Sequence, residues 1–300
     1  MVYTVTFNPA IDLSLTLDSL CEGRVNRCSS ESLTFGGKGI NVSAVLSELG
    51  TQTKALGFCA GFTGQAIVQG LEKAGIGTDF VQLSGGNSRI NVKVKAEKET
   101  EINGRGPDIS DKDLEKLFDK LSALGKGDVL VLAGSVPASV SRSIYSQILE
   151  RLSGRGILFV LDAEGELLLD ALRFEPFVIK PNIHELGQLF GVQINSDAET
   201  EKYAKLLQER GAKNVLVSMA KDGSLLLDEN GKMHRMGVCK GEVVSSVGAG
   251  DSMLAGFISG YLSTGDYSYA LRLATACGGA TAFSQGTAKK ELIDQLLKQI

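Results

Sequence analysis

The sequence predicts an α/β protein whose central sheet is mostly parallel, with a small second sheet inserted into the same domain. Near-continuous apolar runs, typical of parallel strands covered on both faces, occur at residues 129–133, 157–161 and 215–217. Amphipathic helical patterns lie between these runs, as in βαβ units. Two other segments, about 10–35 and 88–104, carry alternating strands instead. We therefore expect residues 1–300 to form one domain, with these two segments as a lid over its binding crevice.

The periodicity of apolar residues along the chain predicts which segments are strands and which are helices. The chain opens with a strand over residues 2–7, which ends where Pro9 interrupts the ladder. An alternating strand follows at 12–18. Apolar residues at helical spacing then predict helices at about 38–49, 64–74, 111–124, 139–152, 198–210, 249–262 and 267–283. In an open sheet of this kind the binding crevice lies at the carboxyl ends of the strands.

The strand at 89–96 separates two kinds of side chain. Its period of two places Arg89, Asn91, Lys93 and Lys95 on one face and apolar residues on the other. The apolar face of a lid needs cover, and the lid of a second copy can supply it, so we expect a homodimer through the lid sheet. The alternative is that this face packs on its own main domain.

Charge and composition exclude several classes of function. The formal net charge is −4 and the pI is about 5.4, so there is no broad basic field for nucleic acid or an anionic membrane. Residues 1–15 lack the pattern of a secretory signal, and no run of 18 apolar residues occurs. The five cysteines show no Cys-x-x-Cys spacing and there are two histidines, which argues against disulfides and zinc. We expect a cytoplasmic protein that binds small molecules.

The segment 245–262 is a glycine-rich turn that runs into a helix. Gly248, Ala249 and Gly250 bring backbone N–H groups of the first helical turn close to a ligand, at the positive end of the helix dipole. Asp251 follows in that turn, so a carboxylate able to accept a proton lies beside an anion site. This pairing suits transfer of a phosphoryl group to a hydroxyl. Alternatively, Asp251 is an ordinary helix-start carboxylate after a tight turn.

A second glycine-rich turn precedes the helix at 38–49. Its glycines, 36, 37 and 39, expose backbone N–H groups, while Lys38 and Asn41 add a cation and an amide donor, which suits an anionic or polyhydroxylated ligand. The sequence Gly-Lys-Gly is not a Walker A loop, which requires Gly-Lys-Ser/Thr. The alternative is a flexible turn with a solvated lysine.

The segment 177–186 is a strand end that turns into a short helix. Asn182 and Glu185 are three residues apart and share one helical face, where their oxygens can hold the water shell of a magnesium ion that carries nucleotide phosphates. The alternative is that Asn182 caps the helix and Glu185 complements its dipole. The intervening His184 has no serine or cysteine partner, so we expect it at the surface.

Four ordered motifs together resemble the PfkB group of ribokinase-like sugar kinases. They are Asn-Pro-x-x-Asp at 8–12, Gly-Gly-Lys-Gly-x-Asn at 36–41, Lys-Pro-Asn-x-x-Glu at 180–185 and Gly-Ala-Gly-Asp at 248–251. The resemblance runs from end to end. It implies a ribokinase-like three-layer sandwich, ATP as phosphoryl donor and Mg²⁺, with Asp251 as the base and residues 248–250 as the anion hole.

The resemblance also implies roles for residues outside these turns. Asp12, Gly37 and Asn41 bind sugar hydroxyls. A phosphate already on the sugar is surrounded by Arg24, Lys38, Arg89, Arg105 and Ser135. Nucleotide phosphates and magnesium are served by Lys180, Asn182 and Glu185, the metal through water. The nucleotide is bordered by Ser218, Gly223, Cys277, Gly279 and Ser284. From the residues alone, we expect Cys277 to pack closely among small residues, either against a flat ring or against other groups of the protein.

The number of cations expected at one crevice of an acidic protein indicates a phosphorylated acceptor. We therefore expect ATP-dependent phosphorylation of fructose 1-phosphate at its 6-hydroxyl. The alternatives are the same chemistry on tagatose 6-phosphate and a non-catalytic sugar-phosphate sensor. Many ribokinase relatives have an acidic residue and a monovalent cation just before the Gly-Ala-Gly-Asp turn. Ser245 stands there in this chain, so the resemblance leaves potassium dependence open.

Overall fold

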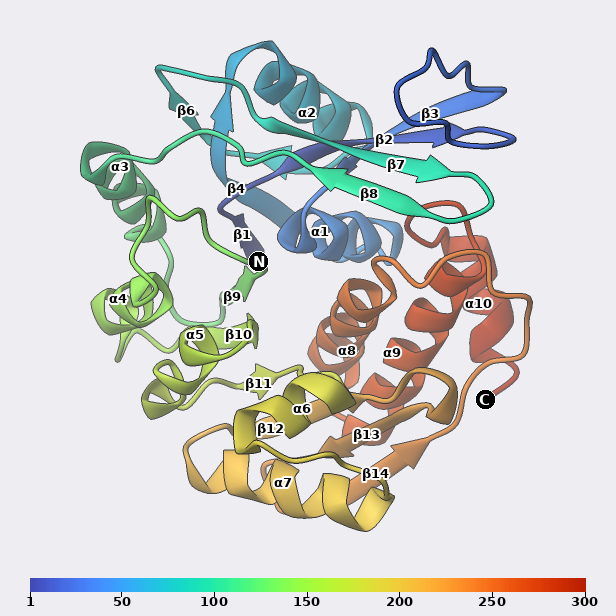
Figure 1. The fold of residues 1–300 in the computed structure, drawn as a ribbon. Helices are drawn as coiled ribbons and strands as arrows, with labels where there is room; N and C mark the ends of the chain where they lie inside the picture. Colours follow the sequence, from blue (N-terminus) through green and yellow to red (C-terminus); the bar gives the residue numbers. More distant parts are fainter.

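The computed structural model describes residues 1–300 and is built around a ten-stranded sheet (Figure 1). Nine strands follow one another in the order β14 (Met233–Met236), β13 (Ser224–Leu227), β12 (Asn214–Ser218), β11 (Val178–Ile179), β10 (Leu158–Asp162), β9 (Val129–Ala133), β1 (Val2–Thr6), β4 (Thr53–Ala60) and β5 (Gly77–Thr78). The tenth, β6 (Val81–Leu83), pairs with β4. All pairs are parallel except β12 with β13 and β13 with β14. The predicted mostly parallel sheet is confirmed.

Helices cover both faces of the sheet and make three layers (Figure 1). Strand β9 is apolar on both faces and so needs helices on both sides. Val129 and Val131 belong to one apolar cluster, and Leu130 and Leu132 belong to the other. The first cluster includes α1 (Lys38–Glu48), α8 (Ala249–Thr264), α9 (Tyr267–Ala282) and α10 (Lys290–Leu297). The second includes α3 (Asp111–Leu121), α4 (Ile144–Leu152), α5 (Glu166–Leu169), α6 (Ile183–Phe190) and α7 (Asp197–Glu209). Helix α2 (Gly61–Lys73) packs on β4 in a third cluster.

Several predicted boundaries differ from the structure. The helix expected from residue 139 begins at Ile144, because hydroxyls before it bond locally: Ser143 N donates to Ser141 Oγ at 3.2 Å. Helix α10 and the antiparallel strands β13 and β14 have no counterpart among the predicted elements. No helix has both the length and the apolar character needed to cross a bilayer.

A separate four-stranded sheet lies above α1, as predicted (Figure 1). Its order is β3 (Ser30–Gly36), β2 (Ala10–Thr16), β7 (Arg89–Lys95) and β8 (Thr100–Asn103). Residues paired across strands point to the same side. One such row is polar and consists of Thr34, Asp12, Asn91 and Asn103; the next row is apolar and consists of Leu33, Leu13, Val92 and Ile102. The small sheet therefore has a polar face toward the body and an opposite apolar face. On the apolar face, Ile11 and Phe35 pack against α1 and α2 of the same chain, while Leu33 and Ile102 are exposed.

Candidate active site

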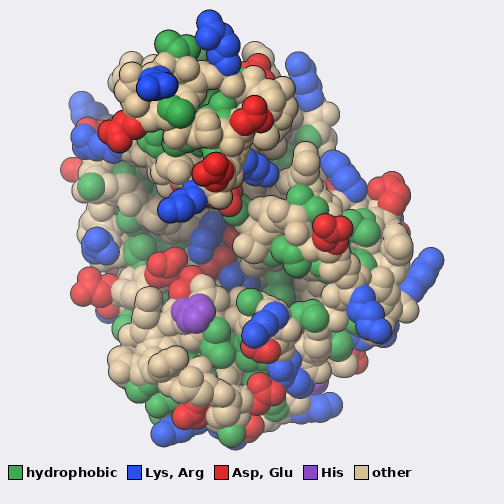
Figure 2. Space-filling view, turned by 45° about the vertical axis from the view of Figure 1, so that its right-hand side comes forward, with side chains coloured by type: hydrophobic (Ala, Val, Ile, Leu, Met, Phe, Trp, Pro, Cys, Tyr) green, Lys and Arg blue, Asp and Glu red, His purple; other side chains and the backbone are tan.

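A cleft of about 450 Å³ opens between the polar face of the small sheet and the carboxyl ends of the parallel strands. Figure 2 shows a hollow in this part of the surface, where charged side chains of both signs gather. The small sheet, α1, the ends of β10 to β12 and the start of α8 all contribute. The cleft brings together twelve residues singled out in the sequence: Asp12, Gly37, Lys38, Asn41, Arg89, Lys180, Asn182, Glu185, Ser218, Gly248, Gly250 and Asp251.

Other singled-out residues lie outside this lining. Arg24 is exposed in the loop between β2 and β3. Arg105 is 76% exposed and pairs with Asp108 at 2.7 Å. Ser135 is exposed beside Gly134, where a Cβ would lie 3.6 Å from the stem of Lys38. The backbone of Ala249 connects two lining residues.

The residues expected at the nucleotide base are also outside the lining. Cys277 is completely buried and its Sγ packs on α8, where a Cβ on Gly256 would lie 2.8 Å from it. Gly279 packs against Cys239, Ser284 Oγ donates to the carbonyl of Ala280 at 2.8 Å, and Gly223 is buried before β13. The structure therefore groups twelve of the predicted site residues around one cleft, but neither these four nor Arg24, Arg105 and Ser135.

The turn before α8 forms the predicted anion site. Gly248 adopts φ 79°, a left-handed conformation that favours glycine, and this lets the chain enter α8 abruptly. The backbone N–H groups of Gly250 and Asp251 donate to no protein acceptor, as expected in a first helical turn. They are available to an anion at the positive end of the helix dipole.

Asp251 is buried, at 6% exposed, and accepts a hydrogen bond from Asn41 Nδ2 at 2.7 Å. Burial and the nearby charge of Asp162 raise its pKa from 3.8 to about 6, although Asn41, Lys180 and Lys38 oppose that rise. A carboxylate with this pKa is deprotonated near neutral pH yet is a stronger base than an ordinary aspartate.

Two lysines share one carboxylate that was not singled out in the sequence. Asp162, the last residue of β10, lies 3.1 Å from Lys38 Nζ and 3.3 Å from Lys180 Nζ. A signal for it existed, because an acidic residue directly after a buried parallel strand points to the crevice edge.

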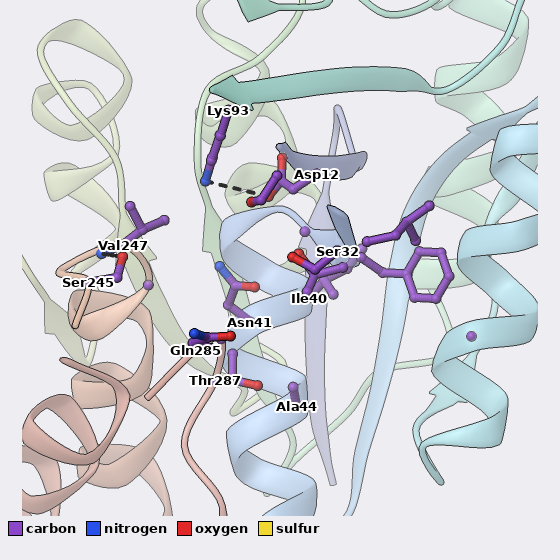
Figure 3. Close-up of a pocket in the computed structure, with 18 of the residues that line it drawn as sticks. Asp12, Ser32, Ile40, Asn41, Ala44, Lys93, Ser245, Val247, Gln285 and Thr287 are labelled. Atoms are coloured by element: carbon purple, nitrogen blue, oxygen red, sulfur yellow. Dashed lines mark hydrogen bonds and ion pairs between the residues drawn. The ribbon is translucent and has the colours of Figure 1, made fainter. Parts of the chain in front are cut away.

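Asp12 is held by its neighbours on the polar face of the small sheet. Asn91 Nδ2 donates to Asp12 Oδ1 at 2.8 Å, and Lys93 Nζ lies 3.9 Å from Asp12 Oδ2. Glycine is needed at position 36, since a Cβ there would lie 2.5 Å from Asp12 Oδ2. In Figure 3, Asp12 and Lys93 approach one another above Asn41. The cleft continues here into a second part of about 440 Å³ beside α1.

Arg89 is a cation without a carboxylate partner. Its Nε donates to the backbone carbonyl of Asn8 at 3.0 Å, and it forms no ion pair. Burial lowers the pKa of Arg89, with the charge of Asp12 opposing this. A half-buried guanidinium with free N–H groups is well suited to bind a phosphate.

Asn182 and Glu185 form a capping box at the start of α6. Asn182 Oδ1 accepts from the N–H groups of His184 and Glu185, both at 2.9 Å, while Glu185 Oε2 accepts from Asn182 N at 2.7 Å. Glu185 Oε1 has no protein hydrogen bond, and burial raises the pKa of this carboxyl. No group of three acidic, histidine or cysteine residues forms a metal cage. This donor set fits Mg²⁺ bound mainly by phosphates and water.

The buried carboxylate, the free helix amides and the surrounding cations are the groups that transfer of a phosphoryl group to a hydroxyl requires. A family model described as pfkB family carbohydrate kinase matches residues 4–293. The chain belongs to the pfkB family of carbohydrate kinases. The family assignment agrees with the resemblance that the four motifs indicate.

Curated relatives of this pfkB kinase match along its whole length. A 1-phosphofructokinase of Bacillus subtilis is 44% identical, with 100% of this chain and 98% of the relative covered. A D-tagatose-1-phosphate kinase of Bacillus licheniformis is 38% identical, with the same coverage. A tagatose-6-phosphate kinase of Staphylococcus epidermidis is 34% identical, again covering 100% and 98%. The relatives therefore include kinases of three ketose phosphates.

Solved structures confirm the ribokinase-like fold. Phosphofructokinase-2 from Escherichia coli in complex with fructose-6-phosphate superimposes with a TM-score of 0.92, at 24% identity over 99% of this chain and 98% of that one. Ribokinase from Arabidopsis thaliana superimposes with a TM-score of 0.81, at 20% identity over 99% and 98%.

Proposed function

We propose that this pfkB kinase transfers the γ-phosphoryl group of ATP to the 6-hydroxyl of fructose 1-phosphate, giving fructose 1,6-bisphosphate and ADP. One observation carries the proposal: the buried base Asp251 and the free N–H groups of α8 open into the same cleft as the unpaired cation Arg89. A kinase of unphosphorylated sugars needs the first two features but not the third. The 1-phosphofructokinase among the relatives supports this choice of substrate.

In the proposed reaction, Asp251 accepts the proton of the 6-hydroxyl as that oxygen forms a bond to the γ-phosphorus. The bond between the γ-phosphorus and the oxygen shared with the β-phosphate breaks, and ADP leaves with the electron pair. The free N–H groups of Gly250 and Asp251 stabilise the charge on the phosphoryl oxygens. Asn41 orients Asp251 by its 2.7 Å hydrogen bond.

The acceptor side of the proposal uses the polar face of the small sheet. Asp12, oriented by Asn91, binds sugar hydroxyls together with Gly37 and Asn41. Arg89 and Lys38 bind the phosphate that is already on the sugar. Arg24, Arg105 and Ser135 complete that group when the lid closes, since the first two lie in segments that flank the small sheet. Closure also excludes water from the reacting phosphoryl group.

The donor side uses the ends of β11 and β12. Lys180 and Ser218 bind nucleotide phosphates, and Asn182 and Glu185 hold the water shell of Mg²⁺, which neutralises phosphate charge when it is bound. We place the base of the nucleotide along Gly223 and the end of α9, at Gly279 and Ser284, with Cys277 behind that surface.

We also propose that a second copy of the chain covers the apolar face of the small sheet. Leu33, Ile90 and Ile102 lie on this face and are 54%, 41% and 62% exposed. A patch contributed by three strands is larger than the scattered apolar residues of an ordinary surface, and a two-fold axis lets identical patches cover each other.

Replacing Ile102 by Asp is expected to convert a dimer into monomers, because the carboxylate would be buried without a partner in the interface. Analytical ultracentrifugation over a range of protein concentrations measures this change. Val192→Asp, an exposed apolar position outside the small sheet, is the control and leaves the dimer intact. A wild-type chain that stays monomeric at every concentration contradicts this arrangement.

The pKa of Asp251 predicts the acid limb of the pH profile. Since the base acts deprotonated, kcat/KM is expected to be level above its pKa of about 6 and to fall toward tenfold per pH unit below it. Initial rates between pH 4.5 and 8.5, with stability checked at each pH, measure the limb. An acid limb near pH 4 would mean that the base is an ordinary, solvated carboxylate.

The proposed function is tested by identifying the product. The purified chain is incubated with Mg-ATP and fructose 1-phosphate, and ³¹P NMR follows the phosphorus. Appearance of a second phosphate ester on C6, with one ADP formed for each ester, supports the proposal. Release of inorganic phosphate, or tight binding of the sugar phosphate with no turnover of ATP, overturns it. The latter result is the behaviour of a sensor.

A further inference from the structure

Asp162 occupies a position that the reaction proposed above does not use directly. It is the last residue of β10, is 1% exposed, and faces the cleft. Its Oδ1 lies 3.1 Å from Lys38 Nζ and its Oδ2 lies 3.3 Å from Lys180 Nζ. Oδ2 accepts no hydrogen bond, so its contact with Lys180 is an ion pair. One carboxylate therefore joins two lysines that come from segments more than 140 residues apart, α1 and the end of β11.

All three groups are charged in this arrangement. Burial alone disfavours a charged carboxylate, but Lys180 and Lys38 lower the pKa of Asp162 overall. Burial likewise disfavours a charged Lys38, yet Asp162, with smaller contributions from Asp251 and Glu185, raises the pKa of that lysine. The trio carries a net charge of +1. Removing Asp162 would leave the buried Lys180 without its counter-ion and close to the half-buried Lys38, which is unfavourable.

The two lysines lie on different sides of the proposed path of transfer. Lys180 approaches the anion turn, since a Cβ on Gly250 would lie 3.1 Å from its Nζ. Lys38 begins α1 and has its stem against Gly134, beside the glycines proposed to bind the acceptor. Two carboxylates remain with which both lysines interact, Asp251 and Glu185. Without Asp162, the base would share with Glu185 the role of counter-ion to both lysines.

We propose that Asp162 is a positioning residue of this kinase: it holds Lys38 and Lys180 at the acceptor and donor sides of the transfer path, and so keeps both lysines from pairing with Asp251. This role rests on the proposed function. Asp162 touches neither the transferred group nor the hydroxyl, and it acts through the lysines. In the ternary complex each lysine has a phosphate to bind, while Asp162 maintains the separation between them.

The variant Asp162→Asn keeps the shape of the side chain and removes its charge. We expect kcat to fall about 10- to 100-fold, the scale on which misplaced catalytic groups act, while KM for ATP and for the sugar phosphate stays level or falls because both lysines are released to phosphates. The acid limb of kcat/KM is expected to move to lower pH. Asn41, Lys180 and Lys38 are the other groups that influence the pKa of Asp251. The two lysines, once released, act in the same direction as the loss of Asp162.

The titration of Asp251 is also measured directly, by ¹³C-carboxylate NMR of the ligand-free protein, so that one readout does not depend on turnover. We expect its pKa to fall in Asp162→Asn. In the double variant Asp162→Asn/Lys38→Met the trio again carries a net charge of +1, and the pKa is expected to return toward the wild-type value. The double variant also avoids leaving the buried Lys180 beside a second unpaired lysine, which protects the test against a failure to fold.

Asp228→Asn is the matched control. Asp228 is also buried and pairs with His234 at 2.8 Å, but it lines neither part of the cleft. This substitution is expected to lower thermal stability and leave the acid limb in place. A wild-type chain that transfers phosphate, with an acid limb and an Asp251 titration that do not move in Asp162→Asn, overturns the role of Asp162 alone. A wild-type chain that transfers phosphate to no sugar phosphate overturns the proposed function and this role with it.

Discussion

Replacing Asp251 by Asn is expected to lower kcat by roughly 10²- to 10⁴-fold, the usual contribution of a positioned general base. Asn has nearly the same shape and can still accept the hydrogen bond from Asn41, but it cannot take a proton from the sugar hydroxyl. The effect should appear in kcat, with KM for both substrates nearly unchanged, because binding uses other groups. Steady-state kinetics at pH 8, where wild-type Asp251 is deprotonated, measures it.

The control for an intact cleft is calorimetry, which measures the binding of ADP and of fructose 1-phosphate to Asp251→Asn. A variant that binds both ligands and retains kcat within tenfold of wild type would show that another group accepts the proton. The buried position and raised pKa of Asp251 would then require a different explanation.

Replacing Arg89 by Ala is expected to raise KM for the sugar phosphate about 10- to 100-fold, equivalent to the roughly 1.5–3 kcal/mol of a hydrogen bond to a charged group. The Arg89 guanidinium has no carboxylate partner that the substitution would leave unpaired. The rise in KM therefore measures the lost contact with the sugar phosphate and not a broken ion pair. KM for ATP should change little. A moderate fall in kcat is expected as well, because Arg89 also orients the acceptor.

Arg151→Ala controls for the loss of an arginine. Arg151 pairs with Glu115 on the surface of α4, away from the cleft, so this variant should retain both KM values. If Arg89→Ala binds fructose 1-phosphate as tightly as wild type does, the sugar phosphate lies elsewhere. The small-sheet residues Lys93 and Lys95, which line the second part of the cleft, would be the next candidates.

The phosphate-side turns could be predicted because their signals are local. Two glycines before a run of apolar residues at helical spacing place backbone N–H groups and Asp251 in one helical turn, although the structure buries α8 on all sides from Asp251 to Gly260. The period of two at 89–96 similarly fixes which residues share the polar face of the small sheet. Each of these inferences depends on a few neighbouring residues.

Other features depend on packing between distant segments and leave no local signal. Lys38 and Lys180 both face Asp162 because of the order of β9, β10 and β11 in the sheet and because of where α1 begins. The exposed position of Arg24 depends on the path of the loop between β2 and β3. The capping box shows a different limit, because Asn182 and Glu185 have the same spacing whether they cap α6 or face a hydrated metal ion.

Substrate preference is measured as kcat/KM for ADP formation with Mg-ATP, with and without potassium. The acceptors compared are fructose 1-phosphate, tagatose 1-phosphate, tagatose 6-phosphate, fructose 6-phosphate and unphosphorylated fructose. We expect the highest value for fructose 1-phosphate and the lowest for unphosphorylated fructose, which offers no phosphate to Arg89. A preference for either tagatose phosphate keeps the mechanism and replaces the substrate. A preference for unphosphorylated fructose contradicts the phosphate pocket on which the proposal depends.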